Sequence, residues 1–198
     1  MRHLRSGAAR ARGSLAVEAA LLMPVLFGVG VLGSDLYRIG VTRGELEQRN
    51  GSLTLTLAMQ RALTAPGLDA LAAVGTQDAP GRYELVILSV RQSGRVNWGF
   101  RRGQGGALCD LPVSGGLYTA GLPEAPPDDA GAGEDGSDFS YIVVRSCRST
   151  ADITLAGGVS WPGVLQVSTV QRAVVLAPAL DEALTLENVA TGLAYSES

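Results

Sequence analysis

The sequence predicts an α+β fold, in which one long N-terminal helix packs on a small antiparallel β-sheet. Residues 19–33 form an apolar run without a charge, and residues 35–63 continue with good helix-forming residues. From residue 82 onward the hydrophobic period changes to two, which is typical of half-buried strands. The chain has 198 residues, enough for an anchor and one modest domain.

Residues 14–34 are predicted to form a transmembrane helix segment. A helix rises about 1.5 Å per residue, so about twenty residues span a bilayer core. Pro24 lies inside this segment, where we expect a helix kink that a membrane tolerates better than water does. Residues 1–13 carry four arginines and no acidic residue. We interpret them as a basic leader peptide on the cytoplasmic side, irregular in structure.

Glu18 stands at the start of the apolar run. A carboxylate is costly to bury there, so it should have a partner or a function. An ordinary membrane anchor would explain the run but not this residue. A secretory signal cleaved before Ser34 is a second alternative, which Glu18 argues against. A buried amphipathic helix is the third, and the run is too uniformly apolar for that.

Residues 35–63 are predicted to extend the helix beyond the membrane. An imperfect stripe at three-to-four spacing supports this, interrupted by Arg43 and Asn50. The stripe consists of Leu36, Ile39 or Gly40, Arg43, Leu46, Asn50, Leu53, Leu57 and Arg61. Residues 53–57 also alternate as a strand would, but both flanks favour a helix.

Residues 64–198 are expected to form the antiparallel-sheet domain, on the side of the membrane opposite the basic leader. After a short helical piece in residues 64–82, strands are predicted at residues 83–90, 95–100, 139–148 and 164–176, with a turn at Ser93-Gly94. Residues 178–198 have weak helical character. Residues 121–138 form an acidic Pro/Gly loop that we expect to be mobile. Its acidic spacing does not match a calcium loop, so no metal is expected.

Cys109 and Cys147 are the two cysteines of the chain. An exported domain would favour a disulfide between them, and two buried free thiols are the alternative. The bond would close a loop of 37 intervening residues. In the chain-entropy model, that closure stabilises a fold by about 4 kcal/mol.

Composition excludes several kinds of chemistry. The single histidine is His3, and all sixteen basic residues are arginine. Catalysis by Ser-His-Asp, Cys-His or Ser-Lys groups is therefore excluded for a chain without its leader. Beyond residue 13 the chain has 12 basic and 19 acidic side chains, which argues against nucleic acid as a partner. We expect no enzyme and no cofactor.

Residues 12–24 read RGSLAVEAALLMP. This segment resembles the processing site of TadE/TadF-like minor pseudopilins of the Tad (Flp) type IV pilus system, whose pattern is RG-x-x-A-V-E-F-A-L-x-x-P. Ala19 stands where an aromatic residue is usual in that pattern. The direct resemblance covers residues 12–61, about a quarter of the chain.

The resemblance implies a pilin-like fold and cleavage between Gly13 and Ser14 by a prepilin peptidase. Glu18 would then be the fifth residue, and it would pair with the terminal amine of a neighbouring subunit to set assembly register. Pro24 matches the family's helix proline.

The implied function is a minor pseudopilin contributing to pilus assembly from the bacterial inner membrane. Its partners would be the peptidase, the major pilin, other minor pseudopilins, an inner-membrane assembly platform and membrane lipid. The alternative is a single-pass, envelope-anchored binding module, with an enzyme less favoured.

Overall fold

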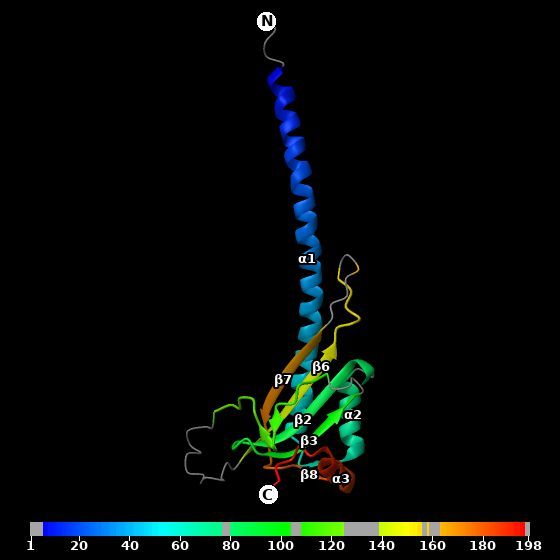
Figure 1. Ribbon diagram of the computed structural model, residues 1–198, viewed down its shortest axis with the longest axis vertical. Coiled ribbons are helices and arrows are strands. Elements are labelled where there is room, and N and C mark those ends of the chain that lie inside the picture. The colour runs from blue at the N-terminus through cyan, green and yellow to red at the C-terminus, as the bar shows by residue number, and fades with distance from the viewer. Residues whose placement is uncertain are drawn as a thin grey trace.

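The computed structural model describes residues 6–76, 80–103, 108–124, 139–155, 158 and 163–196. The predicted α+β class is confirmed, with one long N-terminal helix and an antiparallel sheet. Helix α1 runs without interruption over Ser6–Ala58. Figure 1 shows its N-terminal part projecting alone, far beyond the domain into which its other end packs.

Helix α1 has a projecting half, residues 17–34, and a packed half, residues 35–58. Every described side chain of the projecting half is exposed. The packed half lies against β6 (Ser140–Ser149) and β7 (Val164–Arg172). Its buried positions include Leu46, Asn50, Leu53 and Leu57. One continuous helix therefore combines an exposed apolar half with a half that is packed into a folded domain.

The predicted stripe is confirmed at Leu46, Asn50, Leu53 and Leu57, which are buried. It is wrong at Leu36 and Arg43, and also at Arg61, which is exposed and lies beyond the end of α1. Leu36 is 69% exposed, and the Arg43 side chain points to solvent beside Glu47. The face toward the domain instead begins with Asp35, Ile39 and Thr42, which are buried or half-buried. These positions precede Leu46 at helical spacing, whereas Leu36 and Arg43 are each rotated one residue away.

The helix boundaries also differ from the sequence-based expectation. Residues 6–13, expected to be irregular, belong to α1, because alanine and arginine are strong helix formers. The extension expected to reach residue 63 ends at Ala58, and Ala62–Leu63 forms the short strand β1. The expected mobility of the acidic loop concerns residues 121–138, and all but the first four lie outside the described residues.

The main sheet has the order β3-β2-β6-β7 and is antiparallel throughout. Strand β2 (Tyr83–Arg91) turns at Gly94, which has a φ of 86°, into β3 (Val96–Arg102). Glycine adopts this left-handed conformation without steric cost, as the predicted turn required. Strands β4 (Val113–Ser114) and β5 (Leu117–Tyr118) form a separate small ribbon.

Both faces of the sheet are covered. The packed half of α1 covers one face together with α2 (Ala65–Gly75) and α3 (Glu182–Thr191). Residues 108–122 cover the other face, where Val86, Leu88 and Val143 are buried. Alternate residues of β2 and β6 thus enter two different apolar clusters, as the period of two requires. A 3-10 turn, Pro80–Arg82, precedes β2.

Arg102 at the end of β3 connects the two shorter helices. It pairs with Glu187 of α3 and with Asp69 of α2, the latter at 2.6 Å from Nε to Oδ1. The ionic hydrogen bond to Glu187 raises the pKa of Arg102, and this effect outweighs the lowering by burial. The guanidinium therefore stays charged and holds both helices to the sheet edge.

The C-terminal segment returns to the junction between α1 and α2. Strand β8 (Ala179–Leu180) pairs in parallel with β1. Asp181 then caps α3 by accepting the Leu184 amide through Oδ1, and it accepts the Ala65 amide through Oδ2. One carboxylate thus satisfies the first turns of two helices. Leu184 is fully buried beneath this connection.

The predicted disulfide is present. Cys109 and Cys147 are joined, with their Cα atoms 5.5 Å apart. The bond fixes the segment 108–122 to β6. The buried Glu84 adds a second attachment, because its Oε2 accepts the Cys109 amide at 2.8 Å while Oε1 pairs with Arg101. A buried carboxylate with these partners is satisfied rather than strained.

Candidate functional site

The residues of the expected processing site lie on the projecting half of α1 and just before it. The backbone is helical at Gly13, Ser14 and Glu18, and the Glu18 side chain is exposed. Residues four apart lie on the same helix face. If the chain were cut before Ser14, the new amine would therefore stand one turn from Glu18, at the positive end of the helix dipole.

Pro24 is accommodated within continuous helix. Figure 1 shows no interruption of α1 along the projecting half. The kink expected at Pro24 stays a prediction, because continuity of the helix does not exclude a modest bend.

The projecting half exposes a large apolar surface. Its exposed apolar side chains are Val17, Leu21, Leu22, Met23, Val25, Leu26, Phe27, Val29, Val31 and Leu32. Among the described residues, α1 is the one helix long and apolar enough to cross a membrane, with a mean hydropathy of 1.8 over its most apolar window. So much apolar surface requires a bilayer or other helices to cover it.

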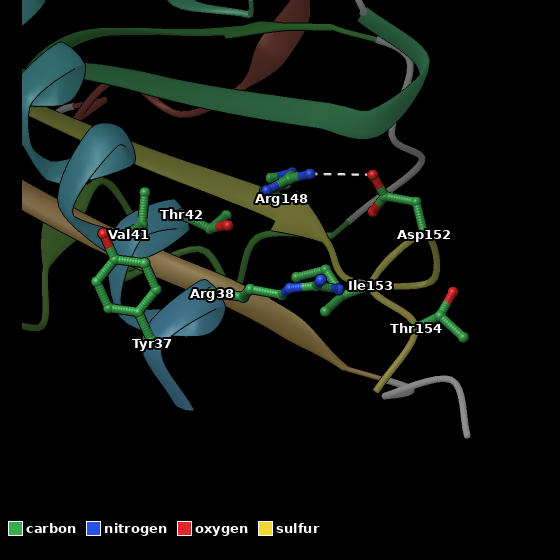
Figure 2. Close-up of a pocket in the computed structure, with 8 residues that line it drawn as sticks. All are labelled: Tyr37, Arg38, Val41, Thr42, Arg148, Asp152, Ile153 and Thr154. Atoms are coloured by element: carbon green, nitrogen blue, oxygen red, sulfur yellow. Dashed lines mark hydrogen bonds and ion pairs between the residues drawn. The ribbon is translucent and has the colours of Figure 1, made fainter. Parts of the chain in front are cut away.

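A groove lies where α1 enters the domain. Its volume is about 390 Å³, and α1 forms one wall while the end of β6 and the residues after it form the other. The lining residues are Tyr37, Arg38, Val41, Thr42, Arg148, Asp152, Ile153 and Thr154. Figure 2 shows Arg38 reaching from α1 toward Ile153 across the groove.

Positive charge exceeds negative charge around the groove. Asp152 receives hydrogen bonds from Arg148 at 3.0 Å and from Arg82 at 2.8 Å. Arg38 makes no hydrogen bond or ion pair with any residue in the described part of the chain. The Nε of Arg148 is buried and also lacks a partner there. The groove therefore offers guanidinium donors to an anionic group.

A second hollow lies on the projecting half itself. It is shallow and open to the outside, because α1 alone forms it, and Met23, Leu26, Phe27, Gly30, Val31 and Ser34 line it. Gly30 has no neighbouring atom within 4 Å of where a Cβ would stand. The missing side chain leaves a notch between Leu26, Phe27 and Ser34, one to two turns before Arg38.

A buried polar contact fixes the packed half of α1 on the sheet. Asn50 donates through Nδ2 to the Val144 carbonyl at 2.9 Å and to Thr169 Oγ1 at 2.8 Å. Ser146 donates to Asn50 Oδ1 at 2.5 Å. All three partners lie on β6 or β7. The position and rotation of the projecting half relative to the domain are therefore set at this contact.

Sequence reasoning singled out the RGSLAVE segment and the two cysteines but missed the groove and the role of Asn50. Asn50 was interpreted as a break in an apolar stripe, although a polar residue at a stripe position is itself a signal for a buried partner. Arg38 follows the apolar run closely, but Arg148, which lines the same groove, comes from a strand 110 residues later.

Within the described residues, no group of three or more His, Cys, Asp or Glu side chains lies close enough to hold a metal ion. Comparison with protein-family models, curated proteins and solved structures finds no match to this chain. Functional inference therefore rests on the motif, the helix and the groove.

Proposed function

We propose that this protein is a minor pseudopilin that contributes to assembly of a Tad-type pilus or a related filament. The observation that carries the proposal is the position of the RGSLAVE motif. It stands at the start of an apolar half-helix that is wholly exposed and continuous with a helix packed into a domain. A pilin-like subunit requires this division of one helix into an assembling half and a domain-bearing half.

The physical chemistry of the helix suits transfer between two apolar environments. Lipid tails and neighbouring apolar helices solvate such a surface about equally well, so leaving a bilayer for a filament costs little hydrophobic free energy. Small residues at Gly28, Gly30 and Gly33 leave room for close helix approach, since no atom lies within 4 Å of a Cβ built there. Glu18 would add specificity by pairing with the amine of an adjacent subunit.

The proposal names the partners and the location. Prepilin peptidase would remove residues 1–13 at the inner membrane, leaving the domain on the periplasmic side. The assembly platform, the major pilin and other minor pseudopilins would then contact the projecting half. No catalytic role is assigned to this chain.

The mature N-terminus tests the proposal directly. The full chain is expressed in cells with and without a prepilin peptidase, and intact mass is measured after detergent extraction. We expect a chain that begins at Ser14 only where the peptidase is present. Gly13→Val should block cleavage at least tenfold, because a β-branched side chain replaces the glycine at the cut. Gly7→Val is the matched control and should be cleaved normally.

Uncleaved protein in the presence of an active peptidase, or a chain that begins at Ser34, would contradict the proposal. The first result would favour the alternative function, a single-pass anchored binding module. The observation that favours this alternative is the arginine-lined groove, which is a binding feature that filament assembly does not itself require.

A further inference from the structure

We propose that the groove beside Arg38 and the notch at Gly30 together form a binding site for one phospholipid molecule. The groove would hold the headgroup phosphate, and the notch would hold part of an acyl chain. This inference rests on membrane insertion of α1, which is part of the proposed function, but not on cleavage or filament assembly.

The two hollows lie on one face of α1. Met23, Phe27, Gly30 and Ser34 follow one another at spacings of three or four residues, and Arg38 and Val41 continue the same series. Residues at such spacings stand one above another along a helix. A single elongated ligand can therefore contact the apolar notch and the charged groove without crossing the helix.

The charged groove also lies at the right depth. With the uncharged segment in the hydrocarbon core, Ser34 is at its edge, and Arg38 lies about 6 Å farther along the helix. The headgroup layer on each side of a bilayer is about 5 to 8 Å thick. Tyr37, exposed beside Arg38, is a residue type that concentrates at this level.

The charges favour an anion in the groove. Arg38, Arg82 and Arg148 contribute three positive charges near the groove, against the carboxylates of Asp152 and Asp35. Asp152 is already shared by two of the arginines, whereas Arg38 makes no ion pair within the described part of the chain. Guanidinium groups bind phosphate oxygens through paired, charge-assisted hydrogen bonds. Thr42 and Thr154 add hydroxyl donors to the lining.

The two parts of the site distinguish a phospholipid from other anions. Inorganic phosphate would use the groove but gain nothing from the notch. A detergent or neutral lipid would use the notch but not the arginines. Dependence on both parts is therefore the property to test.

The test uses the full chain, extracted in mild detergent from a phospholipid bilayer and examined by native mass spectrometry. The wild type is expected to retain one phospholipid, which its adduct mass distinguishes from inorganic phosphate. Arg38→Gln should reduce the occupied fraction about tenfold, as loss of a charge-assisted contact implies. Gly30→Leu should reduce it by filling the notch, without a clash inside the chain.

Two matched controls keep the test specific. Arg43→Gln removes an exposed arginine on another face of α1, and Gly28→Leu fills an open glycine position on the opposite side. Both should retain lipid as the wild type does. Equal retention by Arg38→Gln and Arg43→Gln, or by Gly30→Leu and Gly28→Leu, would overturn the proposal. Recovery of every variant in the membrane fraction shows that insertion itself is unaffected.

Discussion

Asn50 is the residue that makes the contact between α1 and the sheet specific. Apolar contacts alone would allow a helix to slide or rotate at small cost, whereas an amide with three fixed partners has one satisfied position. The residue is 1% exposed, so water cannot replace a lost partner. Its conversion to an apolar residue would leave Ser146 and Thr169 without their side-chain partner on α1.

Asn50→Leu is therefore expected to lower the free energy of unfolding by about 2 to 4 kcal/mol, through buried polar groups left unpaired. Denaturant unfolding of the detergent-solubilised chain measures this loss. Thr56→Ala, at an exposed position of the same helix, is the control and should change stability by well under 1 kcal/mol.

The double variant Asn50→Leu, Ser146→Ala should recover part of the lost stability, because it removes one of the buried polar groups that Asn50→Leu leaves without a partner. A loss below about 0.5 kcal/mol for Asn50→Leu would show that the network does not hold the helix.

The same residue shows where sequence reasoning reaches its limit. A helix period identifies which residues share a face, but Asn50 and Arg43 both interrupt the apolar pattern. Only the strands opposite them show that Asn50 faces three hydrogen-bonding groups while Arg43 faces solvent. Partners 94 to 119 residues away in sequence cannot be inferred from local periodicity.

At the scale of elements, the segment 108–122 depends on its attachments more than on its own structure. Its regular structure is limited to the short ribbon of β4 and β5. It nevertheless covers a sheet face on which Val86, Leu88 and Val143 are buried. The Cys109–Cys147 bond and the Glu84 contact to the Cys109 amide hold one end of this cover in place.

Replacing both cysteines, as Cys109→Ala with Cys147→Ala, is expected to lower the free energy of unfolding by about 4 kcal/mol. Urea unfolding measures the loss, and amide exchange in residues 108–122 should accelerate in the variant. A reducing agent should destabilise the wild type similarly and leave the double variant unchanged. A loss below about 1 kcal/mol would show that the Glu84 contact and apolar packing hold the segment without the bond.

The strands could be predicted because their alternating pattern, as in β2, is local in sequence. The disulfide could be predicted because two cysteines allow a single internal pairing. The end of α1 could not be placed as well, since helical residues continue past Ala58 in sequence. Pairing of Ala62 and Leu63 with a strand near the C-terminus ends the helix instead, and that is a tertiary effect.

At the scale of the whole molecule, the exposed projecting half determines what the protein must associate with. Glu18 is exposed and stands near the start of this half, 17 residues before Asp35, the first buried position among the described residues of α1. A substitution there should leave the fold of the domain intact. Any effect on assembly would then come from contacts between molecules.

Glu18→Ala is expected to leave the protein cleaved and membrane-bound but to reduce filament assembly by about tenfold, because a terminal amine would be buried without its partner. Electron microscopy of cells carrying the complete assembly system measures filament number. Glu45→Ala, on the exposed surface of the packed half, is the control. Unchanged filament number in Glu18→Ala cells would count against a register role for this carboxylate.

The C-terminal connection determines when the domain can be completed during synthesis. Strand β1, at the junction of α1 and α2, pairs with β8. The Ala65 amide donates to the carboxylate of Asp181, which is 116 residues later in the chain. Leu184 is fully buried, so the core remains incomplete until this residue has been synthesised. Contacts of such long range form slowly. Nearly the whole chain must therefore be synthesised before α1, the first element in sequence, can complete its packing against the domain.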